Sequence, residues 1–220
     1  MKSKFESGMS AVSPAKWSAL TDSNFPFSEH DFLSALEETN CVGKESGWTP
    51  CHLTIWENDM LQGALYLYEK NNGYGEYIFD WGWAQAYEQN GLNYYPKLVS
   101  AVPFTPATGR KLLVHSDADD DQIRRKLLEE ALDCMRSRKC SSLHFLYITS
   151  EELSTFNSMG FLIRHSFQFH WKNNNYQDFD QFLSTLKRKR RKEIIRERKQ
   201  IKEQMITVKI LEGKDIKREH

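Results

Sequence analysis

Hydrophobic residues recur at helical spacing most regularly between Asp119 and Lys139. Side chains three or four positions apart share one face of an α-helix, so this spacing predicts an amphipathic helix over 119–139. Its apolar positions are Ile123, Leu127, Leu128, Ala131, Leu132 and Met135. This is the clearest element that the pattern predicts.

Shorter helices are predicted elsewhere. Ser28 is an N-cap candidate, with Asp31 three residues later and an apolar face beyond it; that face is made of Phe32, Leu33 and Leu36. The segment 83–91 ends at Gly91, a residue typical of helix C-termini. Ser150 is a second N-cap candidate, and acidic residues follow it in the first turn.

Apolar runs and alternating patterns predict strands between these helices. Segments 51–57 and 63–70 flank "NDMLQ" and predict a hairpin. Further strands are expected over 76–81, 97–104, 141–148, 161–171 and 206–211, while 109–116 is ambiguous. Strands interleaved with helices predict a mixed α/β (α+β) domain with a central sheet.

A last helix is predicted from Asp178, with Gln181 at the capping-box position, to about Gln204. Within it, the 16 residues "LKRKRRKEIIRERKQI" carry nine Lys or Arg against two Glu. A solvated helix explains this run most simply. Phosphate binding is the rival, through Lys187, Arg188, Arg190 and Arg191. The ligand could be a tRNA acceptor stem, a nucleotide-linked precursor or an anionic membrane surface.

Composition narrows the class of protein. The chain has 220 residues, 40% of them hydrophobic and 13% aromatic, which is typical of a globular fold. Thirty basic residues balance thirty acidic ones, which argues against a dedicated nucleic-acid-binding domain. The first ten residues lack the apolar core of a secretory signal, and the apolar runs are too short to span a membrane.

Four cysteines lie at spacings that match no common motif. We therefore expect a cytoplasmic protein with reduced thiols. A zinc site built from Cys41, Cys51 and His52 would lack the paired-cysteine spacing typical of zinc ligands, so no metal is expected.

Several longer segments resemble a known family. They include "FLSALEETNCVGKESGWTPCHL", "YGEYIFDWGWAQAYEQNGLNYYPKLVSAVPFTPATG", "SSLHFLY" and "GFLIRHSFQFHWKNNNYQDFDQFLSTLKRKRRKEIIRERK". The chain is similar, from about residue 25 to 220, to predicted N-acyltransferases related to the FemAB group, known as peptidoglycan biosynthesis or recognition proteins. The block from the 119–139 helix to the strand after Gly160 also resembles part of the GNAT acyltransferase fold.

This resemblance implies two tandem GNAT-like domains, of which the chain looks like the first. The expected divisions are an N-terminal segment (1–27), a GNAT-like domain (28–177), a basic linker helix (178–205) and the start of a truncated second domain (206–220). The missing domain would be a partner. The strand expected near the C-terminus could also pair with another chain and form a homo-oligomer.

The resemblance also implies transfer of an activated acyl group, from acyl-CoA or aminoacyl-tRNA, to the amine of a small molecule or peptidoglycan precursor. Acyl carriers are held by Gly-rich turns that open helices. The stretch "PFTPATGRK" has one glycine and two prolines, and its simplest interpretation is a loop between strands. This departure argues against coenzyme A binding by this half.

Two carboxylates are the best candidates for a catalytic base. On a strand, Glu76 and Asp80 would share one face and could accept a proton from an attacking amine. Tyr74, Tyr94, Tyr95 and Lys97 are candidate substrate contacts, with an aromatic core and a surface lysine as the alternative. The sequence thus predicts half of an acyl- or aminoacyl-transferase; a non-catalytic scaffold that recognises a cell-envelope precursor, or an RNA-binding accessory, remains open.

Overall fold

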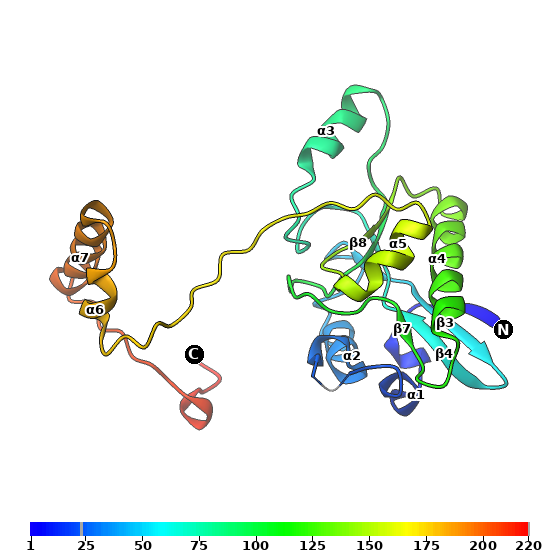
Figure 1. Cartoon of the computed structure of the whole chain (residues 1–220), viewed down its shortest axis with the longest axis horizontal. Helices are drawn as coiled ribbons and strands as arrows, with labels where there is room; N and C mark the ends of the chain where they lie inside the picture. Colours follow the sequence, from blue (N-terminus) through cyan, green and yellow to red (C-terminus); the bar gives the residue numbers. More distant parts are fainter. Residues whose placement is uncertain (23, 220) are drawn as a thin grey trace. The chain divides into compact units, whose positions relative to one another are not determined.

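The computed structural model describes residues 1–22 and 24–219 (Figure 1). Contacts group the chain into two units, Met1–Arg164 and His165–His220, which are described separately. Among the described residues, no helix combines the length and apolar content that crossing a bilayer requires. The predicted divisions into domains remain predictions.

The first unit contains a four-stranded antiparallel sheet in the order β1-β3-β4-β7. Its strands are β1 (Lys2–Glu6), β3 (His52–Glu57), β4 (Met60–Leu65) and β7 (Leu113–Val114). β3 and β4 form the predicted hairpin, but its turn is only Asn58 and Asp59, both at positive φ. The predicted strand 63–70 is divided, because its last three residues belong to the second sheet. β1 was missed because its sequence, KSKFE, is too polar to stand out; charged residues are common on edge strands.

A second sheet has the order β2-β5-β6-β8. Its strands are β2 (Trp48–Pro50), β5 (Tyr68–Lys70), β6 (Lys97–Ser100) and β8 (Leu143–Phe145). β6 and β8 are parallel and the other pairs antiparallel, so the sheet is mixed. The predicted mixed α/β class is confirmed.

Helices cover both faces of the sheets. Side chains of α1 (Pro14–Ser18) and α2 (His30–Glu38) share one core with Ala64 and Tyr66. Side chains of α4 (Asp120–Ser137) and α5 (Leu153–Ser158) share a second core with Leu65 and Leu67. Successive residues alternate between the two cores, as strand geometry requires. The remaining elements are α3 (Trp81–Gln89) and the 3₁₀ turns η1 (Met9–Ala11), η2 (Pro26–Ser28) and η3 (Ser150–Glu152).

Helix periodicity located α4 well, but two N-caps are displaced by one residue. Glu29, not Ser28, precedes α2, and no side chain caps that helix. Thr149, not Ser150, is the N-cap of η3, where it forms a capping box with Glu152. Residue type alone does not distinguish neighbouring cap candidates, because the cap is decided by which backbone N–H groups the fold leaves free.

The second unit contains α6 (Phe179–Ser184), α7 (Arg188–Glu203) and the turn η4 (Gly213–Asp215). The Asp178 carboxylate accepts a hydrogen bond from the Gln181 N–H, which confirms the predicted cap. The single helix predicted to Gln204 is wrong, because it breaks before α7. Ser184 and Thr185 each donate a side-chain hydrogen bond to the carbonyl three residues earlier, and such bonds compete with helix continuation.

Three predicted strands are absent from the part of the chain that the structure describes. Segments 161–171 and 206–211 have no ladder partner, although residues 166–171 and 206–210 alternate. Segment 76–80 is irregular, because Gly75 and Tyr77 adopt positive φ, and Trp81 already begins α3. The common strand face proposed for Glu76 and Asp80 is therefore wrong.

Candidate active site

A lysine nevertheless brings the two candidate carboxylates together. The Lys97 Nζ lies 2.8 Å from Glu76 Oε2 and 2.5 Å from Asp80 Oδ2. The Tyr94 hydroxyl donates a hydrogen bond to the same Asp80 oxygen, at 2.5 Å. These four side chains, named here the Lys97 network, are buried: Lys97, Glu76 and Asp80 are at most 3% exposed.

The backbone around this network is fixed by long-range hydrogen bonds. Lys97 begins β6, opposite Lys70 of β5, and Asp80 immediately precedes α3. The Tyr147 hydroxyl donates to the carbonyls of Glu76 and Tyr77, at 3.2 and 2.9 Å. Tertiary anchors of this kind, rather than a strand ladder, hold the carboxylates against Lys97.

Burial and pairing shift the pKa values of the two carboxylates in opposite directions. Burial raises the pKa of Glu76, and the nearby Lys97 opposes that rise only in part. Burial also acts to raise the pKa of Asp80, but hydrogen bonds from Lys97 and Tyr94 outweigh it and hold that pKa below its usual value. Glu76 is therefore the stronger proton acceptor, while Asp80 stays ionised.

The same surroundings shift the pKa values of two further side chains. Burial, reinforced by the bond to Asp80, raises the pKa of Tyr94, so its phenol stays protonated. Burial and the charge of Lys97 lower the pKa of His144 to about 4, so its imidazole is neutral near pH 7. Within the described chain, Glu76 Oε1 and Asp80 Oδ1 are buried without hydrogen-bond partners, which leaves acceptor capacity in the network.

A pocket of about 480 Å³ borders the network. Trp81, Tyr94 and Tyr95 supply its aromatic wall, and Glu88 adds a carboxylate. Tyr94 belongs to both the pocket and the network, because it is one of the residues that line the pocket and its hydroxyl donates a hydrogen bond to Asp80. Tyr94 therefore connects the buried charges to space that a ligand can enter.

The structure brings together most, but not all, of the predicted site residues. Glu76, Asp80, Tyr94 and Lys97 form one network, and the Tyr95 ring lies 5.6 Å from Lys97 Nζ. Tyr74 does not join them: its side chain is 76% exposed, and its carbonyl accepts hydrogen bonds from Trp48 and Lys70.

The predicted phosphate-binding residues lie in the other unit. Arg188, Arg190 and Arg191 belong to the first turn of α7, and Lys187 immediately precedes it. Arg190 forms an ion pair with Glu193, at 2.7 Å.

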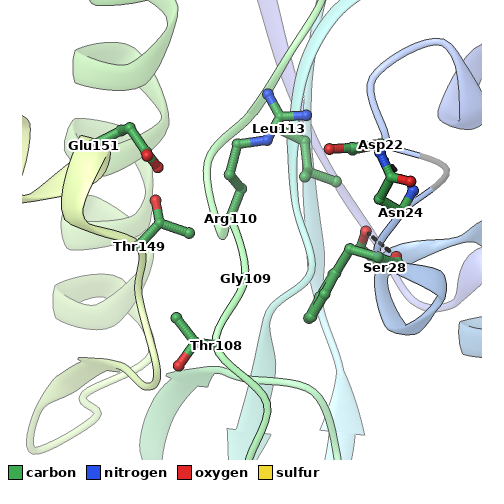
Figure 2. Close-up of a pocket in the computed structure, with 10 residues that line it drawn as sticks. Asp22, Asn24, Ser28, Thr108, Gly109, Arg110, Leu113, Thr149 and Glu151 are labelled. Atoms are coloured by element: carbon green, nitrogen blue, oxygen red, sulfur yellow. Dashed lines mark hydrogen bonds between the residues drawn. The ribbon is translucent and has the colours of Figure 1, made fainter.

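A second pocket, of about 270 Å³, was not found by sequence reasoning. Figure 2 shows Arg110 on an extended segment, with Asp22 and Asn24 on one side and Thr149 and Glu151 on the other. Arg110 lies in the "PFTPATGRK" stretch, which is the loop between strands that we expected, since no helix begins within it. The only feature of the sequence that pointed to this pocket was a basic residue, Arg110, after the lone glycine of the stretch.

The start of α4 is unsuited to a phosphate. A helix that follows a strand often binds pyrophosphate with its free N–H groups. Here the Asp119 side chain accepts from the Gln122 N–H, and Asp120 and Asp121 fill the first turn. These carboxylates occupy the positive end of the helix dipole and would repel an anionic carrier.

Sequence reasoning also missed two buried lysines. Burial lowers the pKa of both Lys70 and Lys111 to about 8. Lys111 Nζ donates to the carbonyls of Gly109 and Tyr147, at 2.6 and 3.1 Å. Their sequence contexts carry no signal, because burial of a lysine is decided by tertiary packing. No group of three metal-binding side chains occurs in the described ranges.

The fold and site together define a mixed α/β protein with a buried acid–base network beside an aromatic pocket. The family model for FemAB-like proteins, described as peptidoglycan biosynthesis/recognition, matches residues 8–220. The chain therefore belongs to the FemAB-like family, as the resemblance in its sequence indicated. No curated protein matches it.

Solved structures resemble the chain only distantly. An aminoglycoside antibiotic 6'-N-acetyltransferase from Acinetobacter haemolyticus is 15% identical, with 80% of this chain and 100% of that one covered and a TM-score of 0.44. A ribosomal-protein-alanine N-acetyltransferase from Brucella melitensis biovar Abortus is 11% identical, with 79% and 100% covered and a TM-score of 0.45. Likenesses of this degree assign no residue of this chain a role.

Proposed function

We propose that this FemAB-like chain takes part in acyl or aminoacyl transfer, and that residues 1–164 hold the amine-bearing acceptor. The single observation that carries the proposal is the junction at Tyr94, where the buried Lys97 network meets the aromatic pocket. Perturbed titratable groups beside a pocket are typical of functional sites. The acceptor would be a cell-envelope precursor, in keeping with the family.

The reaction would form a bond between the acceptor nitrogen and the acyl carbon and break the bond from that carbon to its carrier. The proton lost by the amine would end on the leaving carrier. The Tyr94 hydroxyl donates its hydrogen bond to Asp80, and in this proposal its oxygen accepts an N–H of the bound amine and orients the nitrogen. Glu76, with its raised pKa, is the group in the network best suited to hold a proton in transit.

In this proposal, the acyl donor binds outside residues 1–164. The acidic start of α4 and the proline-containing loop before β7 both argue against a pyrophosphate site in residues 1–164. Acyl-CoA and aminoacyl-tRNA both remain candidate donors, and the site that binds either would lie outside this unit, with a second GNAT-like domain as the proposed partner.

The test is a transfer assay on the full chain, alone and with a FemAB-like second domain supplied separately. Each donor is combined with an amine-bearing peptidoglycan precursor, and acylated product is measured by mass spectrometry. We expect product when both parts are present. Precursor binding without product under every condition would instead support the second candidate, a non-catalytic recognition domain. That candidate is favoured by one observation: Glu76, Asp80 and Lys97 are almost completely buried.

A further inference from the structure

The basic helix α7 concentrates its charge on one side. It carries nine Lys or Arg and three Glu, a net charge of 9 − 3 = +6. Because successive helical residues turn by about 100°, eight of the nine basic residues fall on one half of the helix surface. They are Arg188, Lys189, Arg191, Lys192, Arg196, Arg198, Lys199 and Lys202. A helix that only needed to be solvated would not require this segregation.

Most of this basic face is unpaired. Lys199 contacts Glu203 at 3.3 Å, and Arg198 stacks on the Phe179 ring at 4.4 Å. The other six basic residues of the face have no carboxylate within ion-pair distance among the described residues. α7 buries no residue, so this charge is available to a partner.

Exposed apolar side chains flank the helix in sequence. Before it, Phe167, Phe169 and Trp171 are 79%, 94% and 66% exposed. After it, Val208 and Ile210 are 77% and 82% exposed. The Trp171 ring contacts the ring of Phe182 in α6, and Phe182 contacts Phe179. The Arg198 guanidinium lies over the Phe179 ring. Aromatic and basic groups are thus linked by direct contacts within this unit.

We propose that residues 165–220 form a peripheral membrane-binding unit that recognises anionic lipid. A basic helix face accompanied by Trp, Phe and aliphatic side chains is the combination that lies at a bilayer interface. The lipid phosphates would meet the basic face of α7, and the exposed aromatic and aliphatic side chains would enter the headgroup boundary. An RNA would satisfy the charges and could stack on the aromatics, but it would leave Val208 and Ile210 in water.

Vesicle co-sedimentation of the full chain tests this proposal. We expect binding to vesicles of equal parts phosphatidylglycerol and phosphatidylcholine, and at least tenfold weaker binding to phosphatidylcholine alone. Raising the salt from about 0.1 M to about 1 M shortens the screening length from about 10 Å to about 3 Å and should weaken binding strongly. Equal binding to both vesicle types would overturn the proposal.

Charge removal sharpens the test. The triple variant Arg188→Gln, Lys192→Gln, Arg196→Gln removes three exposed charges from the basic face, and each is worth about fivefold in affinity. We expect a loss of about a hundredfold. The matched control, Lys2→Gln, Lys44→Gln, Lys139→Gln, removes the same charge from exposed positions of the first unit and should bind as the wild type does. Equal losses in both variants would mean that net charge alone drives binding, which contradicts the proposal.

Substituting the exposed apolar side chains distinguishes lipid from RNA as the ligand. Phe169→Ser combined with Trp171→Ser should weaken vesicle binding about tenfold or more, whereas Trp83→Ser, an exposed tryptophan of the first unit, should not. Circular dichroism would check that each variant is folded. If tRNA binds more tightly than the vesicles at the same salt and Val208→Ser with Ile210→Ser leaves vesicle binding unchanged, the membrane assignment is wrong.

Discussion

Lys97 and Lys192 carry the same charge, but the two units surround them differently. Lys97 is fully buried between two carboxylates and a tyrosine, whereas Lys192 is exposed and has no carboxylate partner among the described residues. Buried charge depends on its partners and shifts their pKa values, while exposed charge acts at longer range and is screened by salt. The first arrangement suits positioned chemistry, and the second suits attraction to a charged surface.

The largest contrast is expected from removing each lysine. Lys97→Met leaves two carboxylates buried without a cation, which should lower the free energy of unfolding by about 3–5 kcal/mol. Lys192→Met removes an exposed charge and should leave the free energy of unfolding unchanged. Urea denaturation followed by tryptophan fluorescence measures both. Similar values for the two variants would show that the Lys97 network does not hold the fold.

A third buried carboxylate, in the turn η3, can be compared with an exposed one beside it. Glu152 is fully buried and accepts hydrogen bonds from the N–H groups of Lys111, Leu112 and Thr149. Glu152→Ala should cost about 3 kcal/mol of unfolding free energy, because three donors lose a charged acceptor. Its exposed neighbour provides the control: Glu151→Ala should be nearly neutral. The interpretation fails if the two substitutions have the same cost.

A smaller effect should depend on pH. Burial holds the pKa of Lys111 at about 8, below the ordinary lysine value. Between pH 8 and about 10, the unfolded chain keeps a proton that the folded chain has released, so stability rises with pH. Relative to Lys111→Met, the wild type should gain about 1–2 kcal/mol across this window. Denaturation curves at pH 7 and 9.5 check this.

The comparison with Lys111→Met controls for the other groups that titrate in this pH range. Lys70 and the buried tyrosines titrate in both proteins, so they cancel in the difference. Loss of the two hydrogen bonds from Lys111 adds an offset that does not change with pH. Parallel stability curves for the two proteins would contradict the buried-lysine account.

Local patterns predicted the helices better than the strands. α4 follows from its apolar spacing, and the Asp178–Gln181 cap from residue type alone. Residues 166–171 and 206–210 alternate as strands do, yet they form no ladder in the described chain. Alternation records which side chains could share a face, but a strand also requires a partner, which no local pattern specifies.

The structure brings two of the predicted side chains together, but not on the strand face that we predicted, and their role as a catalytic base remains a prediction. Glu76 and Asp80 do lie together, but Lys97 gathers them from an irregular segment, where Gly75 and Tyr77 adopt positive φ. The pocket around Arg110 combines residues from three separate segments, so its assembly depends on the tertiary fold. Burial of Lys111 was equally invisible to a local pattern.

The central claim is that Tyr94 links the buried network to the acceptor pocket. The most direct measurement compares acyl-transfer rates of Tyr94→Phe and Tyr87→Phe. Tyr87 lies on α3, with its ring 5.2 Å from that of Tyr94, and no hydrogen bond to the Lys97 network. We predict that Tyr94→Phe lowers the rate about a hundredfold while Tyr87→Phe leaves it nearly unchanged. Equal rates for the two variants and the wild type would contradict the account.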